Sequence, residues 1–181
     1  LDDWIAYKRP EVVDEYGLRA VLSPYVADRE GYEFFPSVED NVELLERYHD
    51  TADGRVKVWF GLEHIESCTE EAYRRVADLA AEYDVGIHTH GEESAKKAQE
   101  LTDRYGMRPI EVFDEWGILG PKTVVAHCVW LTNREVEVLS ETGTSVAHCP
   151  TSNEKLASGV APVPKLLNHA VSVGLGTDGI K

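Results

Sequence analysis

The chain has 181 residues, 43% of them hydrophobic, and a formal net charge of −15. This length and apolar content are enough for one sizeable core and exclude a disordered chain, while the acidic balance disfavours nucleic acid and anionic lipid as partners. No apolar run approaches the ~20 residues of a transmembrane helix, the N-terminus does not resemble a signal peptide, and three widely spaced cysteines argue for a reducing compartment. We therefore expect a cytoplasmic protein that binds neither membranes nor nucleic acid polymers.

Apolar, β-branched segments alternate with amphipathic segments along the whole chain. Strands are predicted at residues 18–25, 56–61, 85–90, 123–127, 144–148 and 171–176. Helices are predicted at residues 10–16, 38–48, 69–82, 94–105, 109–116, 132–140 and 162–169. Ser37 and Thr132 are the expected N-caps of two of these helices. The alternation predicts an α/β fold in which βα units are built around a parallel sheet.

The stretch at residues 85–94, VGIHTHGEES, ends an apolar strand in two imidazoles and a carboxylate. His88 and His90 are two residues apart, so on an extended strand they point to the same face. Glu93 follows in a loop. An imidazole near a carboxylate can hold a metal and move protons, but an isolated H-x-H fits a histidine buried in a core equally well.

Four consecutive predicted strands end in a titratable side chain, namely His90, His127, His148 and Asp178. Catalytic groups gather at the carboxyl ends of parallel strands, so this register favours a functional site over packing. The set contains imidazoles and a carboxylate but no cysteine pair with zinc-ribbon spacing, which favours a catalytic metal over a structural one. No glycine-rich phosphate loop follows any of the predicted strands.

Six motifs occur in order in the C-terminal two-thirds: HGEE (90–93), AHCV (126–129), HCPTSN (148–153), KLASG (155–159), APVP (161–164) and GTDG (176–179). Together they resemble the amidohydrolase superfamily, in the branch of cyclic-amidine aminohydrolases and chlorohydrolases that includes guanine, cytosine and S-adenosylhomocysteine deaminases. The resemblance covers roughly residues 55–181. It implies a TIM-type (β/α)8 barrel, present in part from about the third strand to the eighth.

The resemblance also implies the roles of the strand-end residues. One divalent metal, most readily zinc with iron as the alternative, would be held in part by His90 and Asp178. Glu93 would carry a proton from the attacking water to the substrate ring nitrogen, and His127 would orient the water and the leaving group. Asp178 would also accept a proton from the water. These roles are consistent chemically, because the metal lowers the pKa of the water and carboxylates relay its protons.

The loop after the second predicted strand departs from the family pattern. Nucleoside-deaminating relatives carry a histidine there, one further residue and then Pro-Tyr-x-Cys, whereas this chain reads EHIESC at residues 63–68. Glu63 and His64 are therefore predicted to contact the substrate. Acidic groups at this position suit an amino-substituted heterocycle that donates hydrogen bonds.

Four further residues have predicted roles around the site. His148 and Trp130 are candidates for substrate contact, although each equally fits a role in shaping its own loop or packing. His88 mimics the first metal-binding histidine of the family's H-x-H pair, but its position indicates an inward-facing residue that supports the site. Asn153 is expected to fix the loop at residues 148–153.

The resemblance aligns the start of the chain just before the third barrel strand. Barrels of this type need ~250 residues. We therefore expect residues 1–181 to be a partial metal-dependent hydrolase barrel domain. The first two strands, their H-x-H pair and a flanking β-sandwich would be absent, the metal site would be incomplete, and the segment alone would be inactive.

The sequence thus predicts a metal-dependent hydrolase acting on C–N bonds of cyclic amidines. It would deaminate a purine, pyrimidine, pterin or triazine type of ring and release ammonia, with a small heterocycle as its partner and a homo-oligomer as its state. A hydrolytic dehalogenase of a similar ring and a non-catalytic barrel homologue are the alternatives. A two-metal hydrolase with a carbamylated lysine is disfavoured, because no predicted strand ends in lysine.

Overall fold

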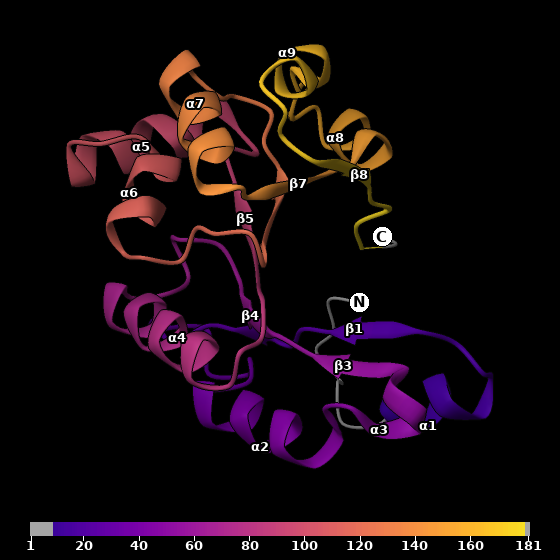
Figure 1. Cartoon of the computed structure of the whole chain (residues 1–181). Coiled ribbons are helices and arrows are strands. Elements are labelled where there is room, and N and C mark those ends of the chain that lie inside the picture. Colours follow the sequence, from indigo (N-terminus) through magenta and orange to yellow (C-terminus); the bar gives the residue numbers. More distant parts are fainter. Residues whose placement is uncertain (1–8, 180–181) are drawn as a thin grey trace. The chain divides into compact units, whose positions relative to one another are not determined.

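The computed structural model describes residues 9–179, and the predicted domain of residues 1–181 extends beyond them at both ends. The chain forms two compact units, the first ending at His88 and the second beginning at Thr89 (Figure 1). Within each unit the paired strands run parallel and alternate with helices, which confirms the predicted α/β fold class. Among the described residues, no helix is both long and apolar enough to cross a membrane.

From residue 9 to His88, the described part of the first unit contains four helices and four complete strands, and a fifth strand leads out of it. In chain order these are α1 (Arg9–Glu15), β1 (Ala20–Leu22), β2 (Tyr25–Val26), α2 (Val38–Tyr48), α3 (Thr51–Gly54), β3 (Val56–Val58), β4 (Phe60–Leu62), α4 (Glu70–Glu82) and β5 (Ile87–Gly91). α2 packs against β3 and α4 against β4, so apolar helix faces cover both strands (Figure 1). The predicted N-cap Ser37 forms a capping box with Asp40, as its sequence position indicates.

The prediction of a single strand at residues 18–25 is wrong, because the chain forms two strands there that belong to different sheets. β1 pairs with β3, with Ala20 opposite Val56, whereas β2 pairs with β4, with Tyr25 opposite Gly61. Pro24 lies between the two strands and has no N–H to donate to a continuous ladder.

The strand predicted at residues 56–61 divides in the same way, at Trp59. The buried side chain of Asn41 in α2 satisfies the interrupted backbone. Its Nδ2 donates to the carbonyl of Trp59 over 3.2 Å, and its Oδ1 accepts from the N–H of Gly61 over 3.1 Å. A buried amide therefore replaces the ladder bonds that an unbroken strand would make.

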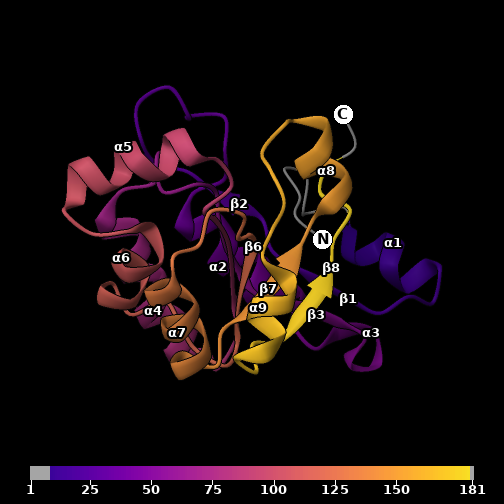
Figure 2. The same ribbon diagram turned by 90° about the horizontal axis from the view of Figure 1, so that it is seen from above.

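The second unit begins within β5. It continues with α5 (Ala95–Tyr105), α6 (Pro109–Glu115), β6 (Thr123–His127), α7 (Asn133–Thr142), β7 (Ser145–His148), α8 (Pro150–Lys155), α9 (Val163–Asn168) and β8 (Val173–Leu175). Its strands are ordered β5-β6-β7-β8, and α6 packs against both α5 and α7. Figure 2 shows these three helices grouped beside β6 and β7. The strand ends that carry the predicted site residues therefore follow one another along one sheet.

One helix of this unit departs from the prediction. Residues 148–153 were expected to form a loop, but Pro150–Lys155 form the helix α8, with Pro150 in its first turn. α8 brings Ser152 and Asn153 into buried positions next to the strand ends.

Candidate active site

The backbone at the strand ends of the second unit is unusual. Glu92, His127, Cys128 and Asp178 all have positive φ, at 54°, 71°, 50° and 57°. Residues with side chains rarely adopt this left-handed conformation, and where they do it is often at functional sites. The sequence gives no direct signal for this backbone geometry.

The two histidines after β5 and β6 lie together. His90 and His127 are 4% and 2% exposed, and their rings stack with centroids 5.6 Å apart and planes inclined by 29°. Nδ1 of His127 lies 2.9 Å from Oδ1 of Asn153 in α8. Because an amide oxygen can only accept, Nδ1 of His127 carries the proton, and Nε2 is left to face the site. Asn153 was predicted to fix its loop, and its side chain in fact orients a catalytic candidate.

Nε2 of His127 faces the carboxylate of Asp178. The distance from Nε2 to Oδ2 is 4.0 Å, which is too long for a direct hydrogen bond. Asp178 is itself held by two donors: the hydroxyl of Ser152 donates to Oδ2, and the N–H of Gly179 donates to Oδ1 over 2.6 Å. An imidazole and a fixed carboxylate at this separation can exchange a proton with a small molecule between them.

Glu93 is half-buried in the loop after β5. The hydroxyl of Ser158 donates to its Oε1 over 3.5 Å. Ser158 is positioned in turn by Trp130, whose Nε1–H donates to the Ser158 carbonyl over 2.7 Å. The indole of Trp130 is 46% exposed, so it combines a structural hydrogen bond with a surface open to a ligand. Its predicted role in substrate contact stays a prediction.

Two other predicted residues lie on strands of the sheet. His148 ends β7 opposite Leu175 of β8. Its Nδ1 is buried and has no hydrogen-bond partner among residues 9–179, which leaves a polar atom unused by the protein. His88 is half-buried on β5 and lies opposite Gly61 in the ladder. The roles predicted for both histidines stay predictions.

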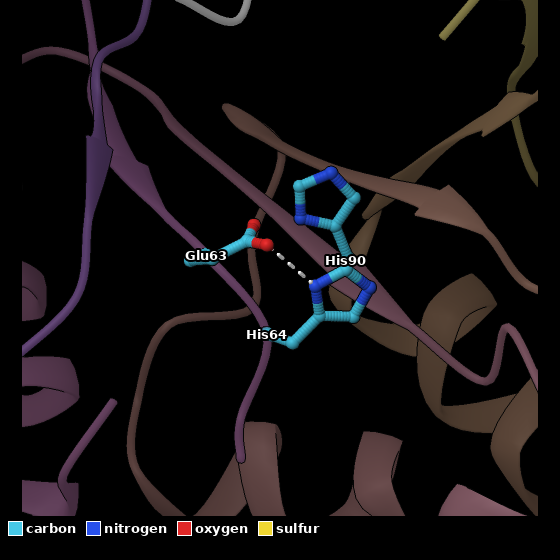
Figure 3. Close-up of side chains that lie close together, drawn as sticks. All are labelled: Glu63, His64 and His90. Carbon is cyan, nitrogen blue, oxygen red and sulfur yellow. Dashed lines mark hydrogen bonds and ion pairs between the residues drawn. The ribbon is translucent and has the colours of Figure 1, made fainter. Parts of the chain in front are cut away.

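In the first unit, Glu63 and His64 follow β4 directly and pair with each other. Nδ1 of His64 and Oε1 of Glu63 are 3.0 Å apart, and both side chains are about one-fifth exposed, at 21% and 20%. Figure 3 shows this contact as a dashed line, together with His90 of β5. The loop that departs from the family pattern therefore presents an imidazole and a carboxylate as one hydrogen-bonded group.

Cys68, at the end of the same loop, is chemically quiet. Its thiol is buried and donates to the carbonyl of Val26, and burial raises its pKa to about 12. The thiol of Cys128 is also buried, and burial raises its pKa well above the usual range. Neither thiol is positioned as a nucleophile.

A buried ion-pair network next to Glu93 was missed by the sequence reasoning. Nη2 of Arg108 donates to Oε2 of Glu92 over 2.6 Å, and its Nε donates to Oε2 of Glu135 over 3.3 Å. Both carboxylate side chains are 0% exposed. Burial, reinforced by the nearby Glu135, raises the pKa of Glu92 to about 9, although Arg108 opposes that shift. Glu135 also forms the capping box of α7 with the predicted N-cap Thr132.

The second unit carries side chains of the types that bind a divalent metal, although no group of three close ligand atoms found among the described residues includes Asp178. His90 and Asp178 offer an imidazole and a carboxylate, the ligand types that zinc takes in catalytic sites. Asp178 is already oriented by two hydrogen bonds, as metal-binding carboxylates usually are. The unpartnered Nδ1 of His148, buried among the described residues, marks a further polar atom of this unit that a bound group would satisfy.

Comparisons with known proteins identify a matching family and several relatives of this chain. The sequence pattern described as the amidohydrolase family matches residues 9–181. The 5'-deoxyadenosine deaminase of Methanothermobacter thermautotrophicus is 42% identical over 168 residues, which cover 92% of this chain and 39% of that protein. The 5-methylthioadenosine/S-adenosylhomocysteine deaminase 2 of Archaeoglobus fulgidus is 41% identical over 170 residues, covering 93% and 41%. The chain therefore spans about two-fifths of the length of these curated relatives.

A solved structure gives the same result for the fold. A zinc-bound adenosine deaminase from Xanthomonas campestris superposes with a TM-score of 0.89 at 29% identity. The superposition covers 98% of this chain and 40% of that one. This similarity confirms the predicted TIM-type fold, of which the chain matches a part.

Proposed function

The chain belongs to the amidohydrolase family, as its motifs predicted, and on that basis we propose that the protein is a metal-dependent hydrolase that deaminates an amino-substituted N-heterocycle. One observation carries the proposal. Asn153 fixes the tautomer of His127 so that Nε2 faces the carboxylate of Asp178 at 4.0 Å. A histidine that serves only in packing does not need one ring nitrogen held by an amide while the other faces a separately held carboxylate.

We propose that His90 and Asp178 contribute ligands to one divalent metal, with zinc as the first choice and iron as the alternative. Zinc is supported by the zinc-bound adenosine deaminase that superposes on this chain. When bound, the metal would lower the pKa of the attacking water towards neutrality. Every other step that we propose is carried out by side chains of the chain itself.

The proton transfers follow from the positions of the carboxylates and the imidazole. Water adds to the ring carbon that bears the amino group, and one of its protons passes through Glu93 to the adjacent ring nitrogen. Asp178 accepts the second proton, and His127 holds the water and the departing amino group in line. The C–N bond then breaks, the amino group leaves as ammonia after taking up a proton, and the ring keeps the oxygen. No oxidant or reductant is required.

The relatives make an adenosine-type purine the first substrate class to test, because their names specify 5'-deoxyadenosine and 5-methylthioadenosine. We propose that the Glu63–His64 pair contacts the substrate, since a carboxylate hydrogen-bonded to an imidazole can accept from hydroxyl or amino groups. His148 and Trp130 are proposed as further contacts. His88 is proposed to support the ligands from its position on β5.

The cytoplasmic location and the homo-oligomeric state are proposals of the same kind. The three cysteines of the chain are all free and buried, which is consistent with a reducing compartment. Sedimentation of the full-length protein would measure its oligomeric state directly.

Metal content and ammonia release together test the proposed function. Elemental analysis of the full-length protein should find about one zinc or iron per chain, and Asp178→Ala should lose most of it. The matched control is Glu137→Ala, which removes an exposed carboxylate of α7 that pairs with surface Arg134. Ammonia release would then be assayed over adenosine, guanine, pterin and triazine substrates, and halide release over chlorinated rings.

The outcomes separate the candidate functions. Metal with ammonia release supports the proposal, and metal with halide release only would replace it with the dehalogenase. Absence of metal from wild type and variant alike would contradict it and favour a non-catalytic barrel homologue.

A further inference from the structure

The network of Glu92, Arg108 and Glu135 lies beside the proposed proton carrier but takes no part in the chemistry described above. Glu92 immediately precedes Glu93 in the loop after β5, Arg108 precedes α6, and Glu135 lies in the first turn of α7. Three segments of the second unit therefore meet at one guanidinium.

Arg108 links the loop after β5 to the loop after β6. Its Nη2 donates both to Oε2 of Glu92 and to the backbone carbonyl of Trp130, each over 2.6 Å. The carbonyl of Glu92 in turn accepts from the N–H groups of Val129 and Trp130, over 2.9 and 3.0 Å. The side chain of Glu92 is thus bonded to Arg108, which also holds the carbonyl of Trp130. The backbone carbonyl of Glu92 is bonded to N–H groups of the segment that follows His127.

Glu135 anchors the other side of the guanidinium. Its Oε2 accepts from Nε of Arg108 and from the N–H and hydroxyl of Thr132, and its Oε1 accepts from the N–H of Ile110 over 3.2 Å. Four donors to one buried carboxylate leave Arg108 little freedom to turn. Arg108 is therefore a rigid bridge and not a mobile surface side chain.

The burial of this network is costly, and that cost calls for an explanation. Both carboxyl groups are fully buried around one cation, and removing charged groups from water costs free energy that an apolar cluster would not cost. Stability alone would be served as well by hydrophobic residues, whereas a bidentate guanidinium fixes distances and directions.

We propose that Glu92, Arg108 and Glu135 are positioning residues, whose network locks the loop after β5 to the loop after β6 and so fixes Glu93 relative to His127. The proposal rests on the proposed function for what Glu93 and His127 do. It adds residues outside the strand-end set whose only task is geometric. Misplacing a reacting group by about 1 Å can reduce a rate about 100-fold, so such a task is important for turnover.

The test combines kinetics with hydrogen exchange in the full-length protein. Glu92→Ala removes the contact to Arg108, and Glu92→Gln keeps an oxygen that can accept from it. Arg108→Lys keeps the charge but cannot reach Glu92, Trp130 and Glu135 at once. The control is again Glu137→Ala on the exposed face of α7. Exchange is followed at the amides of Val129 and Trp130, and melting temperature reports whether each variant folds.

For Glu92→Ala and Arg108→Lys we expect kcat to fall about 10- to 100-fold with KM changed less than about threefold. The amides of Val129 and Trp130 should exchange about tenfold faster, because their acceptor is no longer held in place. Glu92→Gln should recover kcat to within about threefold of wild type, with slow exchange. Wild-type kcat and exchange in both Glu92→Ala and Arg108→Lys would overturn the proposal.

Other results are also decisive. If Glu92→Ala fails to fold, Arg108→Lys alone decides, by the same kinetic and exchange criteria. If Glu92→Gln is as impaired in kcat as Glu92→Ala while its amides exchange slowly, Glu92 affects the reaction by some means other than holding the two loops together, and the positioning role is wrong. If the wild type releases no ammonia from any substrate, the proposed function fails, and exchange at Val129 and Trp130 still decides whether the network locks the loops.

Discussion

The two units of the chain use buried polar side chains in different ways. In the first unit such side chains bond mainly to backbone: Asn41 bridges Trp59 and Gly61, and Nδ1 of His49 accepts from the N–H of Val58 over 3.1 Å. In the second unit several of them also bond to one another, as in the pairs His127–Asn153, Ser152–Asp178 and Arg108–Glu92. The bonds of Asn41 to backbone bridge an interrupted strand, whereas bonds between side chains fix the orientation of both side chains.

The two units also differ in where residues with side chains adopt left-handed backbone conformation. In the first unit it occurs in the turn at residues 50–54, which contains Asp50, Ala52 and Asp53, and at Asp84 after α4. In the second unit it also occurs at the strand ends, at Glu92, His127, Cys128 and Asp178. Strain in a surface turn follows from chain reversal, but strain beside buried titratable groups indicates a site. The proposed catalytic residues Glu93, His127 and Asp178 all belong to the second unit, whereas the first unit contributes one polar pair after β4.

The largest effect is expected at Glu93. If the second unit provides the catalytic groups, a change at Glu93 should lower the reaction rate without unfolding the protein. Glu93→Gln keeps the shape of the side chain but cannot carry a proton, so kcat should fall about 10²- to 10⁴-fold. Steady-state ammonia release by the full-length protein measures this. Glu100→Gln on α5 is the control, since that carboxylate is exposed and pairs only with Lys96. A kcat within threefold of wild type would remove Glu93 from the mechanism.

A smaller effect is expected at Asn153, which touches His127. Asn153→Ala removes the acceptor that fixes the proton on Nδ1, and kcat should fall about 10- to 100-fold. Asn153→Asp keeps an acceptor and should lose less. Asn133→Ala, at an exposed asparagine bonded to Lys165, is the matched control. The tautomer assignment would be contradicted if Asn153→Asp were the more damaging of the two changes at residue 153.

Gly61 tests the scaffold role of the first unit. A Cβ built there would lie 2.3 Å from the backbone carbonyl oxygen of Pro24, so Gly61→Ala forces the backbone apart. We expect a loss of about 1–3 kcal/mol in the free energy of unfolding, measured by urea denaturation. Gly174→Ala in β8 is the control, because nothing lies within 4 Å of its added Cβ. Equal stability of the two variants would mean that the contact with Pro24 relaxes freely.

Most local structure was predictable because its signals are local. The N-caps Ser37 and Thr132 are where the sequence indicated, since each acts within a few residues. The histidines at the strand ends were found because each one ends a predicted strand. The division of two strands was missed, because it depends on which strand pairs with which and not on residue type.

The network of the second unit was missed for a related reason. Glu92 and Arg108 are 16 residues apart, and Arg108 and Glu135 are 27 apart, with no spacing rule that links them. The contact between His127 and Asn153 spans 26 residues and depends on α8, which was predicted as a loop. Long-range partners of buried polar groups follow from the fold, whereas the groups themselves can be read from the sequence.

The smallest expected effect concerns Cys68, the buried thiol of the first unit. Its pKa is raised by burial to about 12, whereas in the unfolded chain a cysteine titrates near pH 9. Because the folded state keeps its proton longer, the unfolded state gains by ionising. The contribution of Cys68 to stability is therefore complete below pH 9 and is lost as the pH rises from 9 towards 12.

Denaturation of wild type and Cys68→Ala at pH 8 and pH 10 measures this effect. The wild type should lose about 1 kcal/mol more than the variant over that interval, since the variant has no thiol to ionise. For each protein, the change in the free energy of unfolding between pH 8 and pH 10 is compared. This separates titration of the thiol from the packing that the alanine loses, because lost packing lowers stability equally at both pH values. Parallel losses would mean that the thiol ionises in the folded state as easily as in the unfolded one, and the first unit would then be open to solvent beside β2 and not a rigid scaffold.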